Sequence, residues 1–146
     1  MIHQVCFLDT SALFKRYVLE TGTDVVDELF SQKNTLLIST VTLCEVTSNL
    51  RRLVDVDQML TVDEFTALKA TFLGDIADGL LDLVHMSPDL ILQGLEILSR
   101  QFVTPLDAIQ LASALSLPQA PVFVCSDQKL SRLASEYGLN VLTPGN

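Results

Sequence analysis

The chain has 146 residues, of which 49% are hydrophobic, and its formal net charge is −9 at pH 7. This length predicts a single domain, residues 1–146, which buries roughly two-thirds of its unfolded surface. The apolar runs are about as long as strands and fall far short of the roughly 20 residues that span a membrane. The chain also lacks the basic and apolar segments of a secretory signal. We therefore expect a cytoplasmic protein that does not enter the membrane.

Short apolar runs alternate along the chain with stretches of helical periodicity. The runs predict strands at Val5–Leu8, Leu36–Ser39, Leu81–His85, Val122–Cys125 and Asn140–Leu142. Strands that alternate with helices favour right-handed crossovers onto a mainly parallel sheet. The predicted fold class is therefore α/β.

The residue pattern describes some of the helices in detail. After the second strand, a core face is predicted from the helical spacing of Leu43, Val46, Leu50 and Leu53. A second face of the same helix carries Glu45, Asn49 and Arg52. Residues 108–117 are apolar almost all round, which predicts a helix packed between other elements. Gly138 is placed to end the last helix in the left-handed conformation.

Four acidic residues stand where a strand-like run ends or a helix begins, and they are Asp9, Glu45, Asp107 and Asp127. In an open α/β sheet, functional sites form at this edge. At an effective dielectric constant of about 20, two carboxylates roughly 4 Å apart repel by about 4 kcal/mol. Four such groups in one place must protonate or hold a hard divalent cation. That is the chemistry of a metal-dependent phosphodiesterase.

Each acid also has a purely structural explanation. Thr42 with Glu45 fits a capping box, and helix N-caps are possible at Asp9, Ser11, Ser126 and Asp127. Thr104 followed by Pro105 fits an N-cap and a proline at the first helical position. Asp107 then lies in the first turn, where its negative charge suits the helix dipole. The metal-site hypothesis rests on the four acids together.

Four segments occur in a fixed order and are distributed along most of the chain. They are Phe-Leu-Asp-Thr-Ser-Ala-Leu-Phe-Lys-Arg-Tyr at 7–17, Glu-Val at 45–46, Leu-Asp-Ala-Ile-Gln-Leu-Ala at 106–112 and Phe-Val-Cys-Ser-Asp at 123–127. A closing Gly-Leu-Asn-Val-Leu-Thr-Pro follows at 138–144. In this order the segments resemble the PIN-domain nucleases, and more closely the VapC-type toxins of toxin–antitoxin pairs. The resemblance implies a PIN-like three-layer fold with a central, mainly parallel sheet of about five strands and about seven helices.

The resemblance also implies an activity. In the family, acids at the positions of Asp9, Glu45, Asp107 and Asp127 bind Mg²⁺ or Mn²⁺, and a metal-activated water hydrolyses RNA to 5′-phosphate and 3′-hydroxyl ends. Hydroxyls that could orient metal-bound waters belong to Thr10, Ser11 and Ser126, although helix capping explains them equally well. The implied partners are an RNA substrate, a cognate antitoxin protein and a second copy of the chain in a homodimer.

The charge distribution bears on an RNA substrate, because phosphate backbones favour basic surfaces. Seven of the acids lie between residues 54 and 85 beside a single base, Lys69, and we expect this segment to form a solvated outer face. The bases that follow the four acids are Lys15, Arg16, Arg51, Arg52, Lys129 and Arg132. Among them we favour Lys15 and Arg52 as phosphate contacts, with Asn49 beside them. Solvated salt bridges are the alternative.

Cys6, Cys44 and Cys125 lack the paired spacing of a zinc site, and their odd number argues against a disulfide framework. We expect buried, reduced thiols, since free cysteine packs as a small hydrophobe.

Two other functions stay open. A phosphatase that used Asp9 as its nucleophile would normally carry a second acid two residues on, where this chain has Ser11. A PIN-like binding module would hold metal or RNA without turnover and would act through a protein partner. Phe14, Tyr17 and Val18 could accept an amphipathic segment of an antitoxin, or they could pack in the core.

Overall fold

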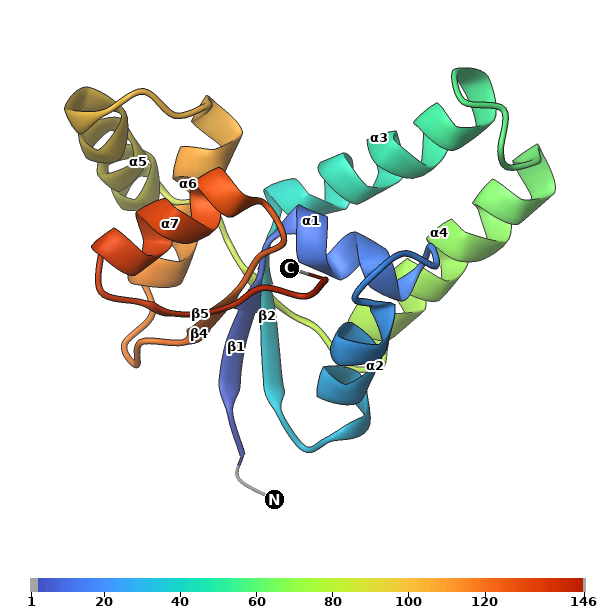
Figure 1. Cartoon of the computed structure of the whole chain (residues 1–146), viewed down its shortest axis with the longest axis horizontal. Helices are drawn as coiled ribbons and strands as arrows, with labels where there is room; N and C mark the ends of the chain where they lie inside the picture. Colours follow the sequence, from blue (N-terminus) through green and yellow to red (C-terminus); the bar gives the residue numbers. More distant parts are fainter. Residues whose placement is uncertain (1–2, 146) are drawn as a thin grey trace.

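A parallel sheet forms the centre of the computed structural model, which describes residues 3–145 (Figure 1). Within these residues the sheet has five strands in the order β3-β2-β1-β4-β5, and every neighbouring pair is parallel. The strands are β1 Val5–Leu8, β2 Thr35–Ser39, β3 Asp82–Val84, β4 Val122–Val124 and β5 Asn140–Leu142. The predicted α/β class is confirmed. β3 is shorter than predicted at both ends, since Leu81 and His85 lie outside it.

Residues 3–145 also form seven α-helices and one short 3-10 helix. They are α1 Thr10–Leu13, η1 Phe14–Arg16, α2 Thr23–Ser31, α3 Val41–Asp55, α4 Val62–Ala77, α5 Pro88–Arg100, α6 Pro105–Leu115 and α7 Gln128–Glu136. Gly138 follows α7 with a φ of 89°, so the predicted left-handed ending is confirmed. No helix in this part of the chain is both long enough and apolar enough to cross a membrane.

The helices cover both faces of the sheet, which gives the predicted three layers (Figure 1). One core joins the sheet to α1 through α4, and the other joins it to α5, α6 and α7. Side chains of β1 alternate between them, with Cys6 and Leu8 in the first core and Phe7 in the second. Phe7 stacks on Phe123 of β4 with 5.9 Å between the ring centroids.

The strand order places a reversal of the chain at the middle of the sheet. The chain runs from β1 outward through β2 to β3, then crosses to the other side of β1 and adds β4 and β5. Such a reversal opens a crevice outside the carboxyl ends of the two strands that flank it. Asp9 directly follows β1, and Asp127 lies three residues after the end of β4.

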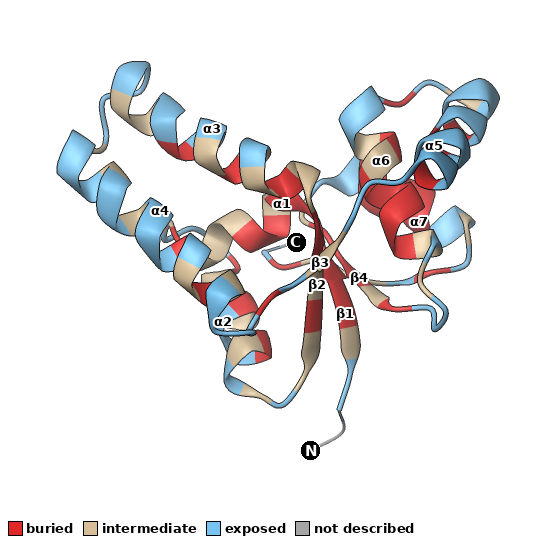
Figure 2. Ribbon diagram, turned by 180° about the vertical axis from the view of Figure 1, so that it is seen from behind, coloured by how far each residue is buried: buried red, intermediate tan, exposed pale blue. Residues whose placement is uncertain are grey.

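The pair formed by α3 and α4 extends beyond the sheet, and the outer side of α4 is mostly exposed (Figure 2). A capping box starts α4: the Thr61 hydroxyl accepts from the Glu64 N–H, and the Glu64 carboxylate accepts from the Thr61 N–H. Phe72, fully buried, connects α4 to the core.

The expectation of a solvated outer face is wrong for Asp75 on α4, which is only 7% exposed. Its carboxylate accepts from Arg16 Nε at 2.9 Å and from the Tyr17 hydroxyl at 2.7 Å. A buried carboxylate is tolerated when it is paired and hydrogen-bonded in this way. Tyr17 itself is buried, and Phe14 and Val18 pack against the same core. The packing explanation of these three residues is therefore the one that the structure supports.

The expectation for the cysteines is confirmed for two of them. Cys6 and Cys125 are buried, and burial raises the pKa of the Cys6 thiol to about 11 and that of Cys125 to about 12. Cys44 is exposed, because it lies on the outward side of α3.

Candidate metal centre

A pocket of about 180 Å³ lies at the carboxyl end of the sheet. Asp9, Glu45, Asp107 and Asp127 all line it, together with Thr10, Ser11, Asn49 and Gln110. The four acids come from four places in the chain: the end of β1, the second turn of α3, the first turn of α6 and the start of α7. The fold therefore brings these acids to one pocket.

Asp9 is the most buried of the four acids, with 4% of its surface exposed. The Ser11 hydroxyl lies 2.7 and 2.9 Å from its two carboxylate oxygens, and the Ala12 N–H donates to Oδ1 at 3.1 Å. Burial raises the pKa of Asp9 to about 6, although these hydrogen bonds act in the opposite direction. A bound cation would stabilise the charged form of a carboxylate that has lost its solvation in this way.

Glu45 is held by two neighbours that meet at one oxygen. Thr10 Oγ1 donates to Glu45 Oε1 at 2.8 Å, and Gln110 Nε2 donates to the same oxygen at 2.9 Å. Gln110 is 2% exposed and also donates to Thr42 Oγ1 at 2.9 Å. The capping-box explanation of Thr42 and Glu45 is wrong, because α3 begins at Val41 and Thr42 faces this buried network.

Gln110 is the residue of this pocket that sequence reasoning missed. Its Oε1 is buried without a hydrogen-bond partner among residues 3–145, which costs about 1–3 kcal/mol. A large amide in the middle of a stretch predicted to be buried almost all round was the available signal, because such a group needs partners.

Asp107 and Asp127 occupy helix starts, as the structural explanations predicted. Thr104 is the N-cap of α6 and accepts from the Asp107 N–H at 3.4 Å, and Asp127 is the N-cap of α7 and accepts from the Leu130 N–H at 3.0 Å. The Asp127 cap bond uses only Oδ1. A carboxylate has about four lone-pair sites, so a capping role leaves room for a ligand.

Electrostatics couple the acids across the pocket. Burial raises the pKa of Asp107, and the charges of Asp127 and Glu45 raise it further, while Thr104 and the nearby Lys129 act against the shift. The carboxylates therefore interact although they start from different elements.

The donor set fits a hard divalent cation. Carboxylates, hydroxyls and amides supply only oxygen ligands at this pocket, which suits Mg²⁺ or Mn²⁺. Within residues 3–145, no three His, Cys, Asp or Glu side chains are gathered closely enough to hold a metal ion as they stand.

The other predicted site residues divide into two groups. Thr10, Ser11 and Asn49 line the pocket. Ser126 is not among its lining residues: its N–H donates to Ser11 Oγ at 3.0 Å and its hydroxyl donates to the Pro144 carbonyl at 2.8 Å.

Lys15 and Arg52 do not line the pocket either. Lys15 Nζ lies 3.7 Å from Glu20 Oε1, and Arg52 Nε lies 3.7 Å from Asp57 Oδ2. Lys15 and Arg52, which we favoured as phosphate contacts, therefore form salt bridges, as the alternative explanation predicted.

Solved structures of other proteins share the fold. VapC20 of Mycobacterium tuberculosis, a sarcin–ricin loop cleaving toxin, is 21% identical with a TM-score of 0.55 and covers 73% of this chain and 78% of its own. VapBC2 of Rickettsia felis, bound to a DNA fragment from their promoter, is 15% identical with a TM-score of 0.64. The match covers 95% of this chain and 98% of the other. A domain of a functionally unknown protein from Methanocaldococcus jannaschii is 13% identical with a TM-score of 0.56. The match covers 96% of this chain and 90% of the other.

No curated protein sequence matches the chain significantly. The family profile of the PIN domain matches residues 6–136. Because this match spans most of the sequence and includes the positions of all four acids, the chain belongs to the PIN domain family.

Proposed function

We propose that the protein is a metal-dependent endoribonuclease and the toxin of a toxin–antitoxin pair. The observation that carries the proposal is the convergence of Asp9, Glu45, Asp107 and Asp127 on one pocket. Membership of the PIN domain family supports nuclease chemistry. The fold shared with VapC20, a toxin that cleaves the sarcin–ricin loop, supports RNA as the substrate class.

Asp9, Asp107 and Asp127 would hold Mg²⁺ or Mn²⁺, with Glu45 as a direct or water-mediated ligand. A bound divalent cation supplies an activated water nucleophile and neutralises charge that develops on the phosphate. The chain's own part is to fix the donors. Ser11 holds the Asp9 carboxylate, and Gln110 holds Glu45, because ligands need outer partners that set their orientation.

The test is cleavage of a labelled RNA by purified protein in Mg²⁺, in Mn²⁺ and in chelator, with a DNA strand of the same sequence beside it. We expect RNA cleavage that needs the divalent cation and falls by orders of magnitude in Asp107→Asn. Asp63→Asn, an exposed acid in the first turn of α4, is the matched control and should cleave normally. Cleavage in chelator, or an Asp107→Asn variant as fast as the wild type, would contradict the proposal.

A binding module without turnover is the second candidate. The spacing of the carboxylates and the engagement of Glu45 by Thr10 and Gln110 favour it. This function predicts that purified protein binds RNA or metal and releases only intact RNA in Mn²⁺. The cleavage assay separates the two functions, because both require binding and only one requires product.

The proposed protein partner is an antitoxin, supported by the fold shared with VapBC2. Production of the chain alone should arrest growth, and co-production of the protein encoded next to it should relieve the arrest. Unchanged growth with a protein that cleaves RNA in vitro would favour a housekeeping ribonuclease.

The proposed homodimer has a candidate surface on α5. The outer face of this helix exposes Ile91, Leu92, Leu95 and Leu98, and a contiguous apolar helix face favours association. Leu95→Lys should shift the protein to monomer in light scattering. Leu73→Lys, at an exposed apolar position of α4, should leave the mass unchanged.

A further inference from the structure

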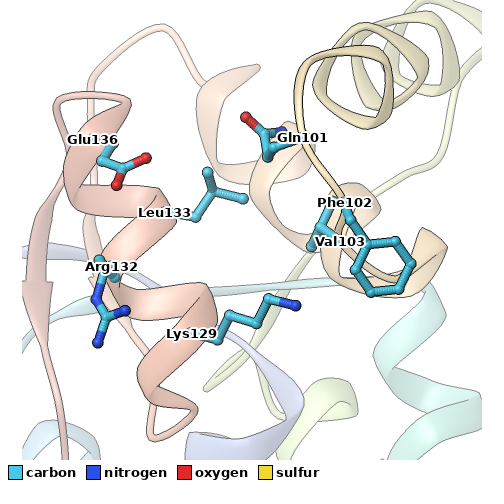
Figure 3. A pocket seen from close by; sticks show the side chains of 7 residues that line it. All are labelled: Gln101, Phe102, Val103, Lys129, Arg132, Leu133 and Glu136. Atoms are coloured by element: carbon cyan, nitrogen blue, oxygen red, sulfur yellow. The ribbon is translucent and has the colours of Figure 1, made fainter.

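A second pocket, of about 140 Å³, lies between α7 and the loop that joins α5 to α6 (Figure 3). Phe102 in this loop is 81% exposed, while its neighbour Val103 is 5% exposed. The buried Val103 anchors the loop, so the adjacent Phe102 side chain projects outward. A single exposed aromatic residue is common on protein surfaces and carries no argument by itself.

Lys129 connects this aromatic ring to α7. Its side chain extends from the helix toward Phe102 (Figure 3), and Nζ lies 4.8 Å from the ring centroid. Within residues 3–145 Lys129 forms no ion pair, and neither does Arg132 of the same pocket, whereas Lys15, Arg16, Arg51 and Arg52 are each paired with a carboxylate. The charge of Lys129 therefore stays available to a phosphate.

The pair formed by Phe102 and Lys129 borders the acidic pocket. Lys129 follows Asp127 by two residues, and its charge acts on Asp107. Phe102 precedes Asp107 by five residues, at the entry to α6. The pair therefore lies near Asp107 and Asp127, two of the four acids that line the acidic pocket.

The pocket also contains two other charged residues. Glu136, the carboxylate of the pocket, lies at the other end of α7 from Lys129 (Figure 3). Arg132 also lines the pocket, but its guanidinium group is turned away from Phe102 in this view (Figure 3). Lys129 is therefore the cation of this pocket that lies beside the exposed Phe102 ring.

We propose that Phe102 and Lys129 form a nucleotide-binding subsite for single-stranded RNA beside the acidic pocket. One base stacks on the Phe102 ring and the adjacent phosphate pairs with the Lys129 ammonium group. Every base has a π-face, so such a platform accepts any sequence whose bases are unpaired. The subsite deepens the proposed ribonuclease function and rests on it for the identity of the substrate.

The test uses the full chain in chelator at low salt, where the proposed cleavage does not occur. One probe is a labelled single-stranded oligoadenylate of about ten nucleotides, and the other has the same length but lacks the bases. Phe102→Leu should weaken oligoadenylate binding about fivefold to a hundredfold, because that is the range for one base–aromatic stack. It should leave the abasic probe unaffected, and Phe102→Tyr should keep the wild-type affinity for both.

Lys129→Gln should weaken both probes alike. It should also lower the slope of log affinity against log salt by about 0.7, the value for one phosphate contact on a single strand. Met59→Ala and Lys69→Gln are the matched controls, since Met59 is 70% exposed and Lys69 is an exposed cation on α4. Both controls should bind like the wild type.

Three results would overturn the subsite. Unchanged oligoadenylate binding by Phe102→Leu, or equal weakening of both probes, would exclude base stacking. Loss of self-association in the same variant with RNA binding intact would identify Phe102 as a protein contact instead. A wild type that fails to cleave RNA would contradict the ribonuclease proposal alone, because the difference between the two probes does not depend on turnover.

Discussion

Asp9 is expected to limit the stability of the metal-free protein. Its pKa rises from 3.8 to about 6 on burial, so the folded state binds the proton more tightly than the unfolded state. Stability is therefore lost as the pH rises from about 4 to about 6 and stays reduced above that. Asp9→Asn should raise the unfolding free energy at pH 7 in chelator by up to about 3 kcal/mol. The gain should vanish near pH 4, as urea denaturation across this range would measure.

Asp127→Asn is the control for this prediction. Asp127 is also a helix N-cap at the same pocket, but it is exposed, and asparagine caps helices as well as aspartate does. Its substitution should raise stability at pH 7 by less than Asp9→Asn does. A gain as large as that of Asp9→Asn would show that repulsion among the acids, and not burial, governs the metal-free state.

Substitution of Gln110 is expected to weaken metal binding without lowering the stability of the fold. Methionine is close to it in size and removes the buried Oε1 that has no partner among residues 3–145. Gln110→Met should therefore change the melting temperature little, because removal of the unpaired oxygen offsets the lost bonds to Glu45 and Thr42. Affinity for Mn²⁺, measured by calorimetry, should fall about 10- to 100-fold. Ser113→Ala, at a buried hydroxyl that bonds to its own helix backbone, should leave the affinity unchanged.

A destabilised Gln110→Met variant with normal Mn²⁺ affinity would make Gln110 a packing residue only.

At the residue scale, the sequence identified the four acids and the hydroxyls of Thr10 and Ser11 beside them, but it did not identify Gln110. Asp9 and Asp127 were predicted as either caps or ligands, and the structure shows caps that also face one pocket. The two roles coexist because a cap bond uses one carboxylate oxygen. Gln110 could not be assigned, because its partners Thr10 and Glu45 are 100 and 65 residues away in sequence.

At the scale of elements, α4 is anchored to the start of the chain by one ion pair. Asp75 accepts two bonds from Arg16 and one from Tyr17. Asp75→Ala would leave Arg16 partly buried without its counter-charge, so we expect a loss of about 3–5 kcal/mol in urea denaturation. Asp55→Ala removes the exposed pair with Arg51 and should cost less than about 1 kcal/mol. Equal effects of the two substitutions would contradict the buried pairing.

The strands were predictable because each is a short apolar run between helical stretches. The burial of Asp75 was not predictable. The number of charged residues in 54–85 does not show which side of a helix each of them occupies. Asp75 shares its helix with exposed acids such as Asp63 and Glu64. Only the partners supplied by Arg16 and Tyr17 distinguish it.

At the scale of the whole molecule, the site follows from strand order. The sequence predicted parallel strands, but it gave no reason for β1 to lie between β2 and β4. That order places Asp9 and Asp127 at neighbouring strand ends, and α3 and α6 supply the other two acids from opposite faces of the sheet (Figure 1). A ligand held there connects the two layers of helices.

Divalent cations are therefore expected to stabilise the whole fold. A ligand that binds only the folded state adds about 2.7 kcal/mol at one hundred times its dissociation constant. Thermal unfolding in Mn²⁺ or Mg²⁺ should show this increase for the wild type and for the exposed control Asp63→Asn. Asp127→Asn should show a smaller increase, since it removes one carboxylate from the pocket.

The same binding should release protons, and its pH dependence identifies the acid involved. Because the pKa of Asp9 lies at about 6, a metal that requires the carboxylate must displace its proton below that pH. Affinity for Mn²⁺ should therefore rise between about pH 5 and pH 7 and then level off. Calorimetry in two buffers of different ionisation enthalpy should find proton release at pH 5.5, about half a unit below that pKa, and almost none at about pH 8. Asp9→Asn should remove most of the release, and Asp107, whose pKa is also raised by burial and by its acidic neighbours, should supply the rest. If wild-type protein showed neither stabilisation nor proton release with either ion, the four acids would not form a metal centre, and helix capping would be the sufficient account of Asp9 and Asp127.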